Sequence, residues 1–109
     1  MTCRVLPAAV SALALLLASP ALGATHALLA GVTRYDHLPE DKHLKAPAND
    51  VDRMRAALLG WGVEPGAMTV LGEGIAGARG RATHANLLRE LEALPARVAA
   101  GDWVVIYLS

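Results

Sequence analysis

Apolar residues form one long block near the N-terminus and three short runs farther along the chain, with polar or helically spaced stretches between them. The short runs cover residues 26–33, 68–71 and 103–108. Each is apolar at nearly every consecutive position and has the length of a strand, which is typical of strands buried on both faces of a sheet. We therefore predict three strands over these residues.

The stretch between the first two runs contains the clearest helical pattern. Its apolar residues recur at intervals of three, four and three positions: Val51, Met54, Leu58 and Trp61. Pro47 suits a first helical turn, where a missing N–H costs nothing, and Gly60 and Gly62 suit a helix C-terminus. The pattern predicts a helix over residues 47–59.

A second helix is predicted between the last two runs. Residues 72–80 carry four glycines and indicate a flexible loop, after which Thr83 is a good N-cap residue. Leucines then follow at helical spacing, at positions 87, 88, 91 and 94. Pro95 is expected to end or kink this helix.

The resulting order is strand, helix, strand, helix, strand. Short buried strands that alternate with amphipathic helices favour parallel, right-handed βαβ crossovers. The fold class is therefore predicted to be α/β: an open, mostly parallel sheet with helices on both faces, seen here as a β-α-β-α-β fragment. The strand over 103–108 could form an unprotected edge, so we expect more sheet to follow Ser109.

The N-terminal block has the features of a secretory signal peptide over residues 1–24. Arg4 precedes an apolar stretch over 10–18, and small residues at 21–24 offer cleavage after Gly23 or Ala24. The alternative is an uncleaved N-terminal anchor. Cleavage would export the protein, leave residues 25–109 as its single domain, and leave no attachment to the membrane.

Composition narrows the classes of partner. Ten Lys and Arg residues balance ten Asp and Glu residues, so no large positive field favours nucleic acid. The only cysteine, Cys3, would be lost with the signal, which excludes a disulfide or a cysteine-based zinc site in the mature chain. The four histidines lack metal-ligand spacing, and we expect no metal and no cofactor.

Gly72, Gly74 and Gly77 match the G-x-G-x-x-G pattern of a dinucleotide site and follow a predicted strand. The predicted helix start at Thr83 comes several residues too late for that site, and no ribose-binding acid follows the third strand. A nucleotide-binding domain that uses residues 72–77 is kept as an alternative. Arg79 and Arg81 could hold an anion, but arginines beside such a loop are expected to be solvated.

Asp50 is the strongest single candidate for substrate binding. It is predicted to lie in the first turn of the first helix, just beyond the first strand, and ligands of open α/β sheets bind beyond the carboxyl ends of the strands. A carboxylate there could accept a charge-assisted hydrogen bond from a basic side chain. The alternative is stabilisation of the helix N-terminus, worth about 0.3–1 kcal/mol.

Four segments, taken together and in order, resemble the caspase-like cysteine peptidases, in particular their bacterial and metacaspase-like branch. The segments are ALLAGVTRY at 27–35, LKAPANDVDRMRAAL at 44–58, ATHANLL at 82–88, and GDWVVIYLS at 101–109. The second is similar to the Leu-x-Gly-x-x-Asn-Asp segment of the family, with Ala46 in place of glycine. The fourth is similar to the strand that runs into the family's Ser-Gly-His-Gly, with Ser109 matching the serine.

The resemblance implies a cysteine endopeptidase whose thiolate attacks a peptide carbonyl while a histidine transfers protons. Both dyad residues are expected beyond Ser109, so the 109-residue chain alone is predicted to be an inactive N-terminal half. The resemblance also assigns Asp50 to the pocket for the residue before the cleaved bond, which implies cleavage after Arg or Lys. Calcium dependence and oligomeric state stay open, and a non-catalytic truncated or pseudo-peptidase binding module is the alternative.

Overall fold

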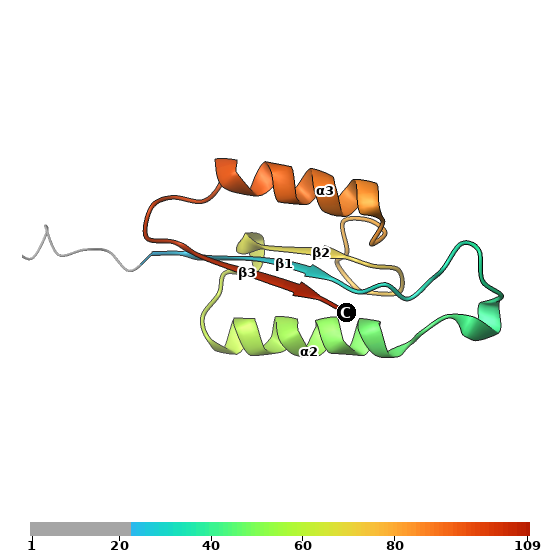
Figure 1. Ribbon diagram of the computed structural model, residues 1–109. Helices are drawn as coiled ribbons and strands as arrows, with labels where there is room; N and C mark the ends of the chain where they lie inside the picture. Colours follow the sequence, from blue (N-terminus) through green and yellow to red (C-terminus); the bar gives the residue numbers. More distant parts are fainter. Residues whose placement is uncertain (1–22) are drawn as a thin grey trace, which may run out of the picture.

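The computed structural model describes residues 23–109, which form a three-layer α/β arrangement. Three parallel strands lie in the order β2-β1-β3, with one helix packed on each face of the sheet (Figure 1). The strands and helices are β1 (Thr25–Ala30), α2 (Ala46–Gly60), β2 (Met68–Leu71), α3 (His84–Ala93) and β3 (Trp103–Leu108), with short 3₁₀ turns at Glu40–Lys42, Pro65–Ala67 and Leu94–Ala96. The predicted α/β class, parallel sheet and two covered faces are confirmed. Apart from Gly23 and Ala24, the predicted signal peptide lies outside the described residues.

The central strand β1 holds the two halves of the sheet together. It pairs with β2 from Ala27 to Ala30 and with β3 along its whole length, so Leu29 stands level with Val70 on one side and Tyr107 on the other. The strand is shorter than the predicted 26–33, because the chain leaves the sheet after Ala30. Gly31 and Val32 still donate hydrogen bonds to the strand ends, to Leu71 (3.0 Å) and Ser109 (2.8 Å).

Alternate residues of β1 belong to two separate hydrophobic cores, as expected for a strand with helices on both sides. Ala27 and Leu29 pack with Val51 and Leu58 of α2, whereas Leu28 and Ala30 pack with Leu71 on the α3 face. The consecutive apolar residues of the run over 26–33 therefore reflect burial on both faces, as the pattern predicted.

Helix α2 begins one residue before the predicted start and ends in a Schellman motif. Gly62 has a φ of 90°, and the N–H groups of Gly62 and Val63 bond to the carbonyls of Leu59 and Leu58. The predicted apolar stripe is wrong at one position: Trp61 is 79% exposed because the helix has already ended at Gly60. For α3, the predicted N-cap is confirmed, since the Thr83 hydroxyl accepts a hydrogen bond from the N–H of Asn86 at 3.1 Å.

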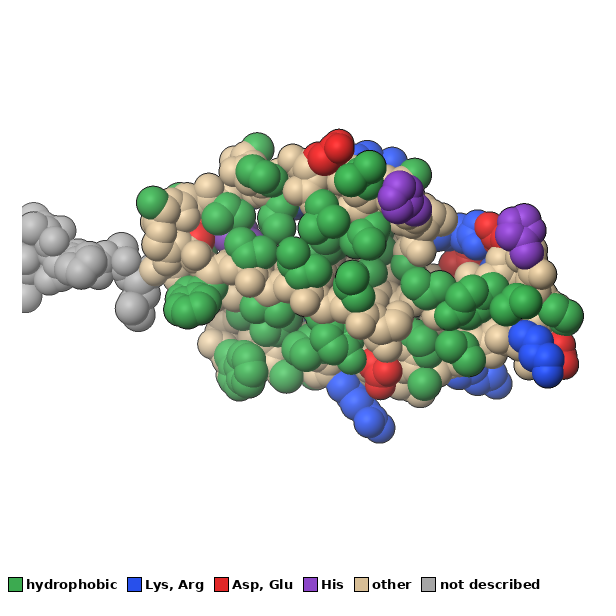
Figure 2. Space-filling model, viewed as in Figure 1, with side chains coloured by type: hydrophobic (Ala, Val, Ile, Leu, Met, Phe, Trp, Pro, Cys, Tyr) green, Lys and Arg blue, Asp and Glu red, His purple; other side chains and the backbone are tan. Residues whose placement is uncertain are grey.

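Strand β3 is an edge of the three-stranded sheet, and its outer side chains are poorly covered. Figure 2 shows hydrophobic side chains crowded over this face of the molecule. Four of the six β3 residues are exposed: Trp103, Val104, Ile106 and Leu108. Within residues 23–109, no helix is both long and apolar enough to cross a bilayer.

Candidate functional site

The carboxyl ends of the three parallel strands meet at one edge of the sheet, and the candidate site is built there. Asp50 projects from α2 toward the end of β3, where its Oδ2 accepts a hydrogen bond of 2.8 Å from the hydroxyl of Ser109. Asp50 is half-buried. Because α2 begins one residue earlier than predicted, Asp50 is its fifth residue and lies just beyond the first turn, which contains no acidic residue. The predicted first-turn position of Asp50 is therefore wrong. Asp50 is therefore engaged by a strand end and not by the N–H groups of its own helix.

Close packing between β1 and α2 sets the position of Asp50. Gly31 follows β1 directly, and a Cβ atom at this position would lie 2.9 Å from the carbonyl oxygen of Pro47 and 3.1 Å from Val51 Cγ2. The absence of a side chain at Gly31 lets the start of α2 rest on the end of the strand. The carboxylate one turn further along then reaches the strand end of β3.

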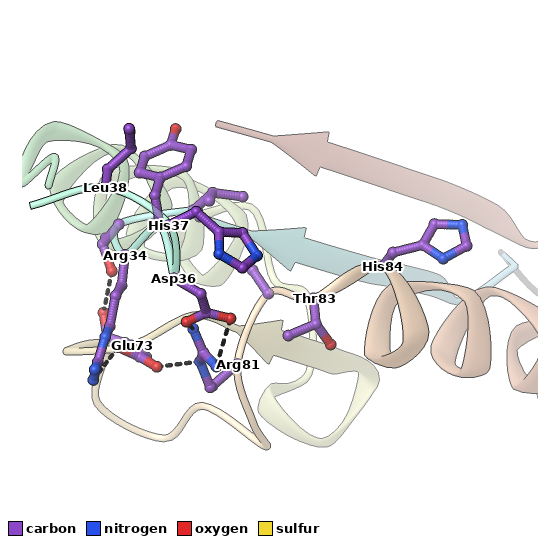
Figure 3. A pocket seen from close by; sticks show the side chains of 13 residues that line it. Arg34, Asp36, His37, Leu38, Glu73, Arg81, Thr83 and His84 are labelled. Atoms are coloured by element: carbon purple, nitrogen blue, oxygen red, sulfur yellow. Dashed lines mark hydrogen bonds and ion pairs between the residues drawn. The ribbon is translucent and has the colours of Figure 1, made fainter. Parts of the chain in front are cut away.

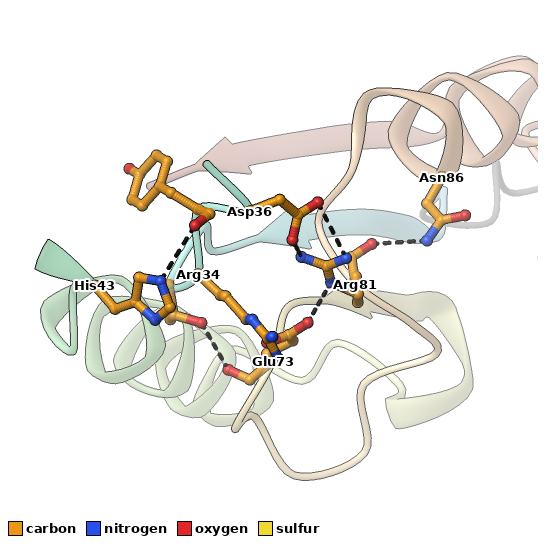
Figure 4. Close-up of polar contacts among 8 residues, drawn as sticks. Arg34, Asp36, His43, Glu73, Arg81 and Asn86 are labelled. Atoms are coloured by element: carbon orange, nitrogen blue, oxygen red, sulfur yellow. Dashed lines mark hydrogen bonds and ion pairs between the residues drawn. The ribbon is translucent and has the colours of Figure 1, made fainter. Parts of the chain in front are cut away.

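A network of charged side chains joins the two loops that follow β1 and β2 (Figure 4). The guanidinium of Arg81 donates to both carboxylate oxygens of Asp36, at 2.6 Å and 3.4 Å, and its Nε faces Glu73. Glu73 also lies 3.8 Å from Arg34, and its backbone carbonyl accepts a hydrogen bond from Thr33. These contacts tie the loop after β1 to the loop after β2.

The contact between Asp36 and Arg81 shifts the pKa values of these two groups. The hydrogen bond from Arg81, together with its positive charge, lowers the pKa of Asp36 below its ordinary value. The same hydrogen bond raises the pKa of Arg81, with burial acting in the opposite direction. Both groups are therefore charged at neutral pH, and the clamp between the loops is ionic.

A hollow of about 380 Å³ opens beside this network (Figure 3). The loop after β1 lines one side of it and the segment leading into α3 lines the other, with His37 and His84 contributed by these two segments. Asp36 and Arg81 lie in its wall and satisfy each other, so neither presents a free charge to a ligand. The hollow has the size of a side-chain or small-peptide subsite at the edge where α/β sheets bind their ligands.

The glycine loop after β2 differs from a dinucleotide-binding turn. Gly74 and Gly77 have φ values of 73° and 74°, but α3 begins only at His84, so no helix N-terminus faces the loop. Its carbonyl groups are used inside the fold, since Arg55 donates to Ala76 at 2.5 Å. The loop therefore lacks the helix N-terminus that binds the pyrophosphate in a dinucleotide site.

The remaining candidates from the sequence are the histidines and Cys3. His43 makes a hydrogen bond of 3.2 Å with the carbonyl of Tyr35, and no cluster of residues within 23–109 could hold a metal ion. Cys3 lies outside the described residues. The described residues therefore contain no cysteine nucleophile.

Two arginines were expected to be solvated; their side chains are 58% (Arg79) and 40% (Arg81) exposed, but each also has an acidic partner that the sequence did not predict. Arg81 is paired with Asp36, and Arg79 lies 3.1 Å from the buried carboxylate of Glu90. Sequence reasoning missed these partners because they come from other elements. One signal could have predicted the partner of Arg81. Acidic residues follow the first and second strands, and the carboxyl ends of parallel strands meet at the same edge of a sheet.

Comparisons of the chain with protein-family models, with curated proteins and with solved structures found no match.

Proposed function

We propose that this chain is the N-terminal part of an exported, caspase-like cysteine endopeptidase that cleaves after Arg or Lys. Asp50 would receive the basic side chain that precedes the cleaved bond. The observation that carries the proposal is the hydrogen bond between Asp50 and Ser109 at the carboxyl edge of the sheet. It joins the candidate for substrate binding to the residue that resembles the serine of the family's Ser-Gly-His-Gly.

The proximity of these two residues matters because of what would follow Ser109. In the family that the sequence resembles, the dyad histidine stands two residues after this serine. Two residues span at most about 7 Å of extended chain. A histidine at that place would therefore lie near Asp50, and a substrate whose basic side chain contacts Asp50 would present its carbonyl to the dyad.

Charge at the site agrees with a basic substrate. The carboxylate of Asp50 has a neutral hydroxyl as its hydrogen-bond partner, so its negative charge is not neutralised by that contact. The neighbouring carboxylates of Asp36 and Glu73, in contrast, are paired with arginines. Asp50 is therefore the carboxylate at this edge best suited to bind Arg or Lys.

The exposed face of β3 agrees with a larger domain. The chain moves from β2 across to β3 with α3 on one face, and a further right-handed crossover in the same direction would place its helix on that face. Val104, Ile106 and Leu108 alternate along β3 with Val105 and Tyr107, which pack on the α2 side. In the complete domain that we propose, a fourth strand would pair with β3 and its crossover helix would cover these three side chains.

The test begins with the native transcript, read past the codon for Ser109. We expect Gly-His-Gly to follow directly and a cysteine codon about 50 residues later. The complete product should then cleave fluorogenic peptides after Arg or Lys, with little cleavage after Asp, and a thiol-alkylating reagent should abolish the activity. A stop codon after Ser109, or a complete product that cleaves no basic peptide, would overturn the proposal in favour of a non-catalytic binding module.

A further inference from the structure

At the amino end of the sheet, opposite the candidate site, the carboxylate of Asp102 collects three hydrogen bonds. Oδ1 accepts from the backbone N–H of Ala24, and Oδ2 accepts from the N–H of Ala99 and contacts Nε2 of His26, each at 2.9 Å. The Asp102 side chain is only 11% exposed. The contact with Ala24 is notable because the predicted signal-peptide cleavage falls on one side or the other of this residue.

We propose that the leader is removed between Gly23 and Ala24, and that the new α-ammonium group of Ala24 forms an ion pair with Asp102 that fastens the mature N-terminus into the sheet. The inference rests on the predicted signal peptide and on this geometry, and it is independent of the proposed peptidase function.

The sequence around the cleavage site favours hydrolysis of the Gly23–Ala24 peptide bond over hydrolysis of the Ala24–Thr25 bond. Leader peptidases require small residues at the first and third positions before the cut. Cleavage after Gly23 places Gly23 and Ala21 there, whereas cleavage after Ala24 places Leu22 at the third position. A chain that began at Thr25 would also lose the nitrogen that contacts Asp102.

The structure already holds Ala24 at the position that the ion pair needs. The carbonyl of Ala24 accepts a hydrogen bond of 2.8 Å from the N–H of Trp103, so the residue extends the pairing of β1 with β3. Gly23 packs against the turn at 101–102, where a Cβ atom would lie 3.0 Å from the Asp102 Cα atom and closer to the Gly101 backbone. Hydrolysis would leave the nitrogen of Ala24 in place.

The chemistry of the cut changes a neutral donor into a charged one. Hydrolysis breaks the C–N bond between Gly23 and Ala24, water supplies OH to the Gly23 carbonyl carbon, and the released amine takes up protons to become an ammonium. The peptide N–H of Ala24 already donates to a carboxylate, and the ammonium adds a full positive charge beside that carboxylate, so Coulomb attraction is added to the hydrogen bond. The processed chain would thus tie the start of β1 to the turn before β3 more firmly than the precursor does.

The charged groups around this nitrogen favour its protonated form. Asp102 is the nearest, and hydrogen bonds from Ala99, His26 and Ala24 lower its pKa, so it is ionised at neutral pH. Glu64, just before the 3₁₀ turn Pro65–Ala67, lines a hollow shared with Gly23 and Ala24. His26, which bonds to Asp102, is the nearest group that could compete for the carboxylate as a cation.

The experiment uses the full chain, exported from a bacterial host and purified after processing. Intact mass and N-terminal sequencing should show a chain that begins at Ala24. The pKa of its α-amino group would then be measured from the pH dependence of acetylation, with Lys42 and Lys45 as internal references. An ordinary α-amino group titrates at about 7.7–8.0. We expect a higher pKa in the native chain, with reaction near pH 8 slowed several-fold, and a return to the ordinary range in urea.

Three variants test whether Asp102 causes the raised pKa of the α-amino group. Asp102→Asn should abolish it, while Glu64→Gln, the matched control, should leave most of it. A chain extended by one residue, beginning at Gly23, keeps Asp102 but moves the ammonium away, so it tests the ion pair even if Asp102→Asn folds poorly. It should show an ordinary pKa. An unprocessed chain, a start at any other residue, an ordinary pKa in the native chain, or a shift abolished by Glu64→Gln alone would each overturn the proposal.

Discussion

The hydroxyl of Ser109 donates a hydrogen bond of 2.8 Å to the carboxylate of Asp50, although the two residues are 59 positions apart in the chain. Asp50 lies on α2 and Ser109 follows β3, so the rest of the first crossover and the whole of the second separate them. The hydrogen bond forms because β3 pairs directly with β1 and α2 packs against the end of β1. This hydrogen bond holds the Asp50 carboxylate at the edge of the sheet where ligands of α/β folds bind. The hydroxyl of Ser109 is neutral and does not neutralise the charge of a carboxylate.

Replacing Asp50 tests its role in substrate binding. In the complete peptidase that we propose, we expect Asp50→Asn to lower kcat/KM for cleavage after Arg or Lys about ten- to a hundredfold, since a hydrogen bond to a charged group contributes roughly 1.5–3 kcal/mol. Asp52→Asn is the matched control, because Asp52 lies on the same helix, is 51% exposed and pairs only with Arg55 among the described residues. Equal kcat/KM values for the Asp50 variant and the wild type would remove Asp50 from the pocket.

The ion pair between Asp36 and Arg81 predicts a pH dependence of stability. The pKa of Asp36 is lowered in the folded chain, so its contribution is fully present above the unfolded pKa of about 3.9 and is lost as the pH falls through the lower folded value. Urea unfolding should show Asp36→Asn to be less stable than the wild type at pH 7, with the difference shrinking toward pH 3.

Asp41→Asn serves as the control for this measurement. Asp41 lies in the same loop and is 3.9 Å from Lys42, but its side chain is 74% exposed, and such pairs contribute little. A difference between Asp36→Asn and wild type that stays constant from pH 7 to pH 3 would contradict an ionic clamp.

Gly31 tests the close approach of β1 and α2. We expect Gly31→Ala to destabilise the fold by about 1–3 kcal/mol, the usual cost of overpacking, because the added Cβ would lie 2.9 Å from the backbone oxygen of Pro47. Gly66→Ala is the control, since nothing lies within 4 Å of a Cβ atom there. Chemical denaturation of the two variants should separate them, and equal midpoints would show that α2 can shift away from β1 without cost.

The edge strand β3 predicts the behaviour of the isolated chain. Residues 24–109 should be poorly stable and should self-associate, because an exposed apolar edge favours pairing between molecules. Ile106→Lys, at a position 50% exposed on β3, should shift sedimentation velocity profiles toward the monomer. Leu59→Lys places the same charge on α2 and should leave association unchanged. A wild-type chain that is monomeric and unfolds in one sharp thermal transition would contradict this expectation.

Local patterns predicted most of the fold. The runs at Met68–Leu71 and Trp103–Leu108 coincide with β2 and β3, and Thr83 caps α3 as expected. These features follow from short-range physics: the spacing of apolar residues reports which faces are buried, and hydroxyl groups before a helix accept its free N–H groups. The errors lie at element ends, where β1 stops at Ala30 and Trp61 falls beyond α2, because the last residue of a periodic pattern need not belong to the element.

The spacing of apolar, capping and acidic residues was enough to predict the class of fold, the positions of its strands and helices, and Asp50 as a candidate for substrate binding. Which side chains meet depends instead on long-range packing, which brings Asp50 to Ser109, Arg81 to Asp36, and Asp102 to the nitrogen of Ala24. Each of these pairs joins elements far apart in the chain. Their contact depends on the strand order β2-β1-β3 and on the faces that the crossovers take, and no local spacing of residues encodes that order.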